Sequence, residues 1–294
     1  MINFRYHVVS IIGIFIALAV GVVLGAGPLQ RSINAGMNPS SSQAASDPVL
    51  SAQAEAEAAG LKALASSTLT GSLTGTSVAL VVLPGASDDD VSAIRSTLTD
   101  AGASVVGRVT LTDNWQSTSM SQYRTTLATT LASHLQSGAA KTASADGVVG
   151  YSIVQVLTST GAETDLLRQI LTDKSTPLMT IDEDPAGQAT TLVAVGARAQ
   201  TTTSTQASVA ASSDAWIGLG LAVGSTSGVV VGDASSREAM ISQIRTSGTA
   251  VTTVDSVGTT LASVDTALAL STASSGARAF GVGNGAQSVI PSSK

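Results

Sequence analysis

An uncharged apolar run near the start of the chain constrains the fold more than any other feature. Residues 8–27 read VVSIIGIFIALAVGVVLGAG and contain no Asp, Glu, Lys or Arg. A helix rises 1.5 Å per residue, so this run would be about 30 Å long, roughly the thickness of the hydrocarbon core of a bilayer. We therefore expect residues 1–27 to form a transmembrane anchor that ends before Pro28.

A cleaved signal peptide is the alternative for this segment. Its apolar region would span about 7–15 residues before a small-x-small cleavage site, which residues 25–27 could supply. The greater length of the run favours a retained anchor. Arg5 precedes the run, and after Arg31 no basic residue follows until Lys62. The positive-inside rule then predicts a single-pass protein of the cytoplasmic membrane, with its N-terminus inside and its C-terminal domain extracytoplasmic.

Small residues recur every fourth position along the expected anchor. In lipid, helices associate by close packing, and small residues let two backbones approach each other. We predict that a partner helix, or a second copy of the chain, binds along this stripe, although Gly and Ala are also common in membrane helices generally. The stripe consists of Gly13, Ala17, Gly21 and Gly25.

Residues 28–75 are expected to hold a polar linker and then a juxtamembrane helix. Asp47 is a good N-cap, and Pro48 suits the first helical position. Apolar positions in this helix alternate by four and three, which is the spacing of a coiled-coil seam. The seam predicted to bind a partner is Ala54, Ala58, Leu61 and Ala65. A helix docked on its own domain is the alternative.

Two β-α-β patterns predict an α/β domain over residues 76–294. Residues 77–83 are apolar throughout, as in a strand buried on both faces, and Ser87 caps a helix that starts with three aspartates. A second strand-helix-strand pattern covers residues 228–254, where residues 235–238 read as a capping box. We expect a doubly wound, Rossmann-like, mostly parallel sheet built from two related halves.

Composition narrows the functional classes. The net charge is −6 and the 14 Lys and Arg residues are scattered, which argues against nucleic acid as a partner. The chain has no Cys, so thiol catalysis and disulfides are excluded. Its two His and five Met residues show no ligand spacing, which argues against a tight local copper site.

Catalytic and cofactor motifs are scarce. Neither G-x-S-x-G nor H-E-x-x-H occurs in the sequence. We therefore expect the chain to have no enzymatic activity, no cofactor and no metal site. The aspartates at residues 88–90 would repel a phosphate at the helix N-terminus, and they read as a capping device. Residues 182–184 read as an acidic loop rather than a glycosidase pair. The glycines at residues 281–285 read as a turn where backbones approach closely.

The chain resembles the actinobacterial MctB family, whose members are described as copper-transport outer-membrane proteins. The resemblance covers most of the chain and is weakest in the middle. It rests on the opening residues 1–29 and on the segments VALVVLPGASDDDV (78–91), GRVTLTDNW (107–115), GVVVGD (228–233) and FGVGNGA (280–286), with a later Pro291.

The resemblance implies two functions that differ. One is copper transport or copper resistance at the cell envelope. The other follows the corynebacterial SteB members, which act with a membrane partner, SteA, in cell separation by controlling peptidoglycan hydrolysis. Because the residues provide neither catalytic groups nor copper ligands, we favour a non-enzymatic envelope protein that binds a SteA-like partner, or itself, and keep copper handling as the alternative.

Overall fold

The computed structural model describes residues 48–199, 210–272 and 276–291. The chain divides into two compact units, residues 1–55 and residues 56–294, and the description below concerns the second. The expected anchor over residues 1–27, with its stripe, lies outside the described residues, as does the linker to residue 47. Within the described ranges, no helix has both the length and the apolar character needed to cross a membrane.

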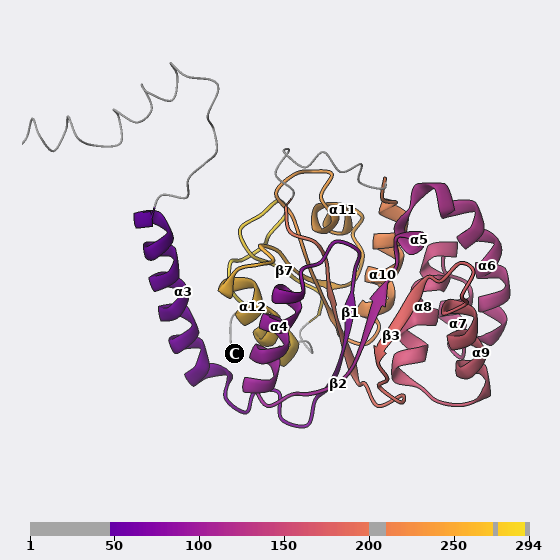
Figure 1. Ribbon diagram of the computed structural model, residues 1–294, viewed down its shortest axis with the longest axis horizontal. Helices are drawn as coiled ribbons and strands as arrows, with labels where there is room; N and C mark the ends of the chain where they lie inside the picture. The colour runs from indigo at the N-terminus through magenta and orange to yellow at the C-terminus, as the bar shows by residue number, and fades with distance from the viewer. Residues whose placement is uncertain (1–47, 200–209, 273–275, 292–294) are drawn as a thin grey trace, which may run out of the picture. The chain divides into compact units, whose positions relative to one another are not determined.

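A seven-stranded sheet forms the centre of the second unit (Figure 1). Its order is β3-β2-β1-β4-β5-β6-β7, and all neighbours pair in parallel except β2 and β3. The predicted α/β class with a mostly parallel sheet is thus confirmed. The strands are β1 (Ser77–Val82), β2 (Ser104–Leu111), β3 (Met179–Glu183), β4 (Thr191–Val195), β5 (Val229–Val231), β6 (Thr252–Val254) and β7 (Ala279–Phe280).

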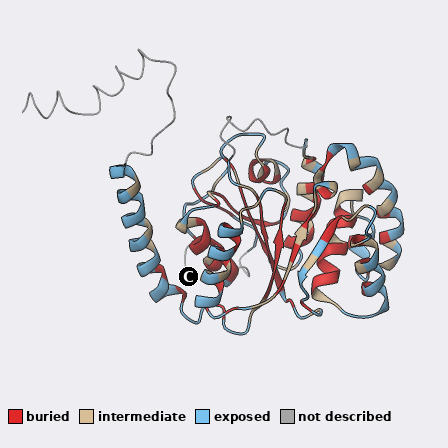
Figure 2. Ribbon diagram, in the orientation of Figure 1, coloured by how far each residue is buried: buried red, intermediate tan, exposed pale blue. Residues whose placement is uncertain are grey.

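Helices cover both faces of this sheet, because side chains on each central strand alternate between two buried clusters. Val78, Leu80 and Val82 of β1 pack with α4 (Asp88–Asp100) and α12 (Thr260–Ser271). Ala79 and Val81 face the second layer. Burial of each such aliphatic side chain contributes about 1.5–3 kcal/mol. Figure 2 shows the central strands of the sheet as buried.

The second layer of helices covers the other face of the sheet and is built mainly from the middle of the chain. Its inner members are α8 (Ala145–Thr158), α10 (Ser213–Gly224) and α11 (Met240–Thr246), and α8 is further covered by α6 (Ser121–His134) and α9 (Ala162–Leu171). Three short helical turns complete it: α5 (Asp113–Gln116), η1 (Thr118–Met120) and α7 (Gly138–Lys141). Arg124 of α6 is fully buried and is neutralised by Asp146 of α8, with Nε and Oδ1 2.5 Å apart.

The helix α3 (Pro48–Leu69) begins at the predicted proline. Its last turns pack on the domain, because Ala65 and Leu69 are buried in the same cluster as α4 and α12. Leu61 and Ala58 are half-buried, and Ala54 is exposed. The docked-helix alternative therefore describes the end of α3, and partner binding along the seam stays a prediction.

The structure corrects the start of one helix. The expected capping box at residues 235–238 does not open α11, which begins only at Met240. Asp233 accepts hydrogen bonds from the backbone N–H and the hydroxyl of Ser235, and this local turn competes with helix formation. Ser236 accepts instead from the N–H of Ala239, at the residue where the helix is about to start. The predicted buried face, including Met240, Ile241 and Ile244, is confirmed.

Candidate functional site

The strand order creates a topological switch point between β1 and β4. From β1 the chain proceeds outward to β2, whereas β4 is followed by β5 on the other side. In open α/β sheets, ligands bind beyond the carboxyl ends of the strands at such a point. The loops that meet there are residues 83–87 after β1 and residues 196–199 after β4.

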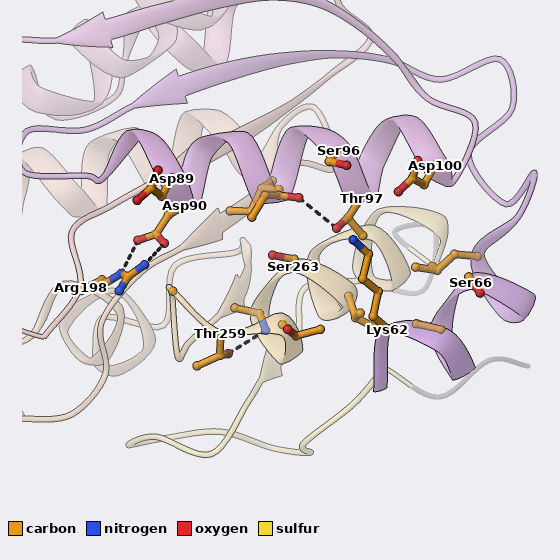
Figure 3. A pocket seen from close by; sticks show the side chains of 18 of the residues that line it. Lys62, Ser66, Asp89, Asp90, Ser96, Thr97, Asp100, Arg198, Thr259 and Ser263 are labelled. Carbon is orange, nitrogen blue, oxygen red and sulfur yellow. Dashed lines mark hydrogen bonds and ion pairs between the residues drawn. The ribbon is translucent and has the colours of Figure 1, made fainter. Parts of the chain in front are cut away.

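An internal ion pair occupies this switch point. Asp90 lies in the first turn of α4, with its side chain only 3% exposed. Arg198, from the loop after β4, donates from Nε to Oδ2 at 2.8 Å and from Nη2 to Oδ1 at 2.5 Å. Figure 3 shows this two-bond arrangement at one end of a groove. The hydrogen bonds and charge of Asp90, with the charge of Asp89, raise the pKa of Arg198.

A glycine in a third loop makes room for the arginine. Gly258, in the loop between β6 and α12, has a φ of 91°, a left-handed conformation that favours glycine. A Cβ atom at this position would lie 2.4 Å from Nε of Arg198. Arg198 therefore connects the loop after β4 with the first turn of α4 and with the loop after β6.

A second internal cluster surrounds Asp255, directly after β6. Its Oδ1 accepts from the N–H of Val282 at 2.9 Å and from the hydroxyl of Ser256 at 2.7 Å. Its Oδ2 accepts from the N–H of Gly283 and from Nη1 of Arg245, each at 2.9 Å. Every oxygen of this buried carboxylate is thus satisfied by protein donors.

The glycine-rich segment at residues 281–285 encloses this carboxylate. Gly281 has a φ of 121°, and a Cβ atom there would lie 2.1 Å from Oδ1 of Asp255. The expectation of a turn with close backbone approach is confirmed. The same segment accepts from Arg245, whose Nη2 donates to the carbonyl of Phe280 and whose Nη1 donates to that of Asn284, both at 2.8 Å.

Burial and hydrogen bonding act in opposite directions on these charges. Burial is the largest influence on Asp255 and opposes its ionisation, but the donors Ser256, Val282, Gly283 and Arg245 outweigh it and hold the pKa of Asp255 below its ordinary value. Burial lowers the pKa of Arg245 despite the neighbouring carboxylate. The cluster is therefore an ion pair at neutral pH.

Asp265 on α12 is the third acidic group of this region. It has no exposed surface, and neither carboxylate oxygen has a hydrogen-bond partner among the described residues. Burial, and then the charge of Asp255, raise the pKa of Asp265 to about 7. Its carboxyl group therefore changes charge near neutral pH.

A groove of about 450 Å³ runs along the outer side of this region, between the end of α3 and the helices α4 and α12. Its apolar lining comes from Leu69, Ile94 and Val264. Serine and threonine hydroxyls line most of the remainder, and the exposed charges besides the paired Arg198 are Lys62, Asp89 and Asp100. Because Asp90 is already paired with Arg198, the remaining charge of the groove is acidic.

The acidic segment at residues 182–184 is held by arginines. Glu183 pairs with Arg95 of α4, and Asp184 pairs with Arg168 of α9, both at 2.5 Å. These contacts lower the pKa of both carboxylates, with the arginine hydrogen bond as the largest cause. Asp182 accepts from Thr110 and lies 3.4 Å from Nε of Arg108. The arrangement supplies strand-edge ion pairs in which Glu183 and Asp184 are each bonded to an arginine.

Copper ligands are dispersed in the described part of the chain. In residues 48–199, 210–272 and 276–291, no three His, Cys, Asp or Glu side chains are grouped to hold a metal ion. Nδ1 of His134 contacts Glu163 at 2.5 Å, while Met179 and Met240 are buried in an apolar cluster. Copper(I) prefers thiolate, thioether and imidazole ligands, so the described residues do not form a local site that suits it.

The residues that sequence reasoning missed are Arg198, Asp255, Arg245 and Asp265. The sequence indicates only a capping role for the aspartates that include Asp90. The cap itself is present, because Ser87 accepts a hydrogen bond from the N–H of Asp89. Asp265 carried a usable signal, since this aspartate interrupts an otherwise uncharged helix at residues 261–270, LASVDTALAL. The predicted stripe lies outside the described residues, and the predicted seam lies on α3, where Ala65 also adjoins the groove.

Together, fold and site define a class of protein: a doubly wound α/β domain in which a carboxylate–arginine pair, Asp90 with Arg198, lies at the switch point of the sheet. The chain belongs to the MctB family, because residues 1–291 match the family model described as "Copper transport outer membrane protein, MctB". The resemblance inferred from the sequence is thereby confirmed. No curated protein matches the chain.

Proposed function

We propose that this protein is a membrane-anchored envelope protein that acts through protein–protein contacts and has no catalytic turnover of its own. In this proposal it binds a SteA-like membrane partner, and the pair controls peptidoglycan hydrolysis during cell separation. The transmembrane stripe and the seam on α3 would contact the partner, and the α/β domain would present a binding surface outside the cytoplasmic membrane.

One observation carries the proposal: the switch point is filled from within. Arg198 and Asp90 satisfy each other where an α/β enzyme would hold its cofactor, and Asp255 is saturated by Arg245 and two backbone N–H groups. Groups that are already paired gain little by exchanging one partner for another. This favours a domain that recognises surfaces over one that transforms a small substrate.

The groove along α4 and α12 is the surface best suited to such contact. Its apolar lining would bury aliphatic side chains, and Asp89 and Asp100 lie at opposite ends of α4 (Figure 3). On a helix, eleven positions separate these residues by about 16 Å. The complementary occupant is a segment of a partner protein that carries aliphatic residues between basic ones. The acidic rim disfavours an anionic lipid surface.

Site-specific photo-crosslinking in the native membrane tests this proposal. A photoreactive residue would replace Ser66 or Ser96, both exposed in the groove, or Thr129, exposed on α6 of the opposite layer. We expect the groove positions to crosslink to a partner peptide that contains Lys or Arg. The double substitution Asp89→Asn and Asp100→Asn should lower the yield several-fold.

A matched control uses aspartates away from the groove. Asp165 and Asp214 are exposed and lie in the first turns of α9 and α10, as Asp89 does in α4. Their double substitution to Asn should leave crosslinking unchanged. Equal crosslinking from Thr129, or equal loss in the control, would place the contact elsewhere. Digestion of peptidoglycan by the purified chain would overturn the non-enzymatic role itself.

Copper transport or resistance is the second candidate, and the family description favours it. The described residues lack a grouped set of ligands, so copper would have to bind weakly, between copies or through residues such as His7 and Met37 that lie outside the described ranges. Titration of the purified full chain with copper(I) against a competing chelator separates the candidates. A tight, stoichiometric site, with copper sensitivity but normal cell separation after gene deletion, would replace our proposal.

A further inference from the structure

The buried carboxyl group of Asp265 is the most anomalous polar group in the described structure. It lies on α12 with no exposed surface, and both oxygens lack a hydrogen-bond partner there. An ionised carboxylate in such a place is costly, because water is lost and nothing replaces it. A protonated carboxyl removes the charge and lowers this cost. The packing of α12 is therefore tied to the charge of one side chain.

Among the described residues, no basic side chain is paired with Asp265. Asp255 is the charged group that acts on it, and its effect is repulsive. The strands β5 and β6, which pack against α12, contain only Val and Thr residues.

The third neighbour, α4, has charged side chains that are committed elsewhere or exposed. Asp90 pairs with Arg198, Asp88 with Arg108 and Arg95 with Glu183. Asp89 and Asp100 are exposed acids, and Lys62 of α3 is exposed across the groove. Within the described ranges no neighbour pairs with Asp265, so the charge that it acquires on ionisation has to be relieved by movement of α12 or by entry of water.

The same helix forms one wall of the groove. Ala262, Ser263 and Val264, which directly precede Asp265, line it together with Thr259 and Thr260 at the start of the helix. A change in how α12 packs on the sheet will therefore change the shape of the groove, since these residues cannot move independently of the next residue on a helix.

We propose that Asp265 is a proton-sensing group: its neutral carboxyl holds α12 packed against the sheet, and its ionisation loosens α12 and reshapes the groove. The device responds to the pH of the compartment that contains the domain, without a bound ligand.

The direction of the response follows from linkage. The folded-state pKa of Asp265 is raised from 3.8 to about 7, so the folded chain binds this proton more tightly than the unfolded chain does. The stabilising contribution is complete below the ordinary pKa and falls as pH rises, until it is lost above about 7. At acidic pH, α12 should stay packed against the sheet, and at alkaline pH this packing should loosen.

Hydrogen exchange of the full chain in detergent, followed by mass spectrometry, tests the device. Protection of the amides of residues 260–271 would be measured from about pH 5 to about pH 9 and corrected for intrinsic exchange. One titrating proton allows protection to fall by up to about tenfold per pH unit within the titration range. We expect such a decline over α12, while α8, whose one charged residue, Asp146, pairs with Arg124, serves as an internal reference.

Two substitutions complete the test. Asp265→Asn removes the titration and should make protection of α12 independent of pH, as should Asp265→Leu if the amide variant does not fold. A pH-independent protection in the unaltered chain would overturn the proposal, whatever the variants do. Retention of the decline in Asp265→Asn would assign it to another group and would overturn the proposal equally.

Discussion

Arg198 and Asp90 form a two-bond ion pair across the switch point of the sheet, although 108 positions separate them in the sequence. Three loops depend on this pair, because Gly258 leaves the space in which the guanidinium lies. The same contact joins α4 to the loop after β4 and lies at the place where this fold commonly receives a ligand.

Removal of the arginine should destabilise the domain. Arg198→Ala leaves Asp90 buried without its partner, and we expect a loss on the order of 1–2 kcal/mol, since the arginine itself is half-exposed and partly screened. Arg198→Lys should be intermediate, because lysine cannot form the paired hydrogen bonds. Chemical unfolding of the chain in detergent gives the free energies.

The control for this prediction is an exposed pair. Arg95→Ala breaks the contact with Glu183, in which both side chains are partly exposed, and it should cost less than about 1 kcal/mol. If Arg95→Ala and Arg198→Ala destabilised the chain equally, the switch-point pair would have no special structural importance.

Gly281→Ala should be among the most damaging single substitutions in the domain. The added Cβ atom would lie 2.1 Å from Oδ1 of Asp255, and the φ of 121° is strained for alanine. We expect a loss above about 3 kcal/mol, or failure to fold. Gly276→Ala isolates the backbone strain, since its φ is 92° but no atom lies within 4 Å of the new Cβ. That control should cost about 1–2 kcal/mol, and equal losses would refute the carboxylate clash.

Acid should destabilise the domain through Asp255. The donors around its carboxylate hold its folded-state pKa below the ordinary 3.8, so its contribution is present above that value and is lost as pH falls through the folded-state pKa. Thermal melts at decreasing pH should show a steeper decline for the unaltered chain than for Asp255→Asn. If the melting temperature of the variant fell with pH in parallel with that of the unaltered chain below about pH 4, Asp255 would not be the cause.

Partner binding by the expected anchor is predicted from sequence alone. Gly21→Ile or Ala17→Ile would block close approach of a second helix along the small-residue stripe, whereas Phe15→Leu on the opposite side would not. Co-purification from detergent, with expression and insertion checked, should therefore recover less partner, or less of a second copy, from the first two variants. Equal recovery from all three would reduce the segment to a tether.

Local patterns in the sequence predicted much of the fold. The strand β1, the cap at Ser87 and the helix α4 are adjacent in the sequence, so periodicity and capping define them without help from distant residues. The predicted start of α11 was wrong because Asp233 forms a local turn with Ser235 that competes with the helix. The two-residue strand β7 was missed because its pairing to β6 is too short to leave a pattern.

The site could be predicted only in part, since its contacts join distant loops. Nothing in the spacing of Asp90 and Arg198 indicates that they meet, and Asp255 reaches its backbone donors 27 and 28 positions later. The glycines at residues 281–285 did reveal a close backbone approach, but the carboxylate that they enclose was not apparent. Such pairings depend on strand order, which periodicity does not determine.

The acidic segment at β3 has a consequence for contacts between neighbouring copies of the chain. Within the described structure, β3 is an edge strand, and Asp182, Glu183 and Asp184 lie at its end in contact with Arg108, Arg95 and Arg168. An uncharged edge would be a template on which a neighbouring chain could add its own strand. This row of acidic and basic side chains along the edge disfavours the addition of a strand from a second copy of the chain.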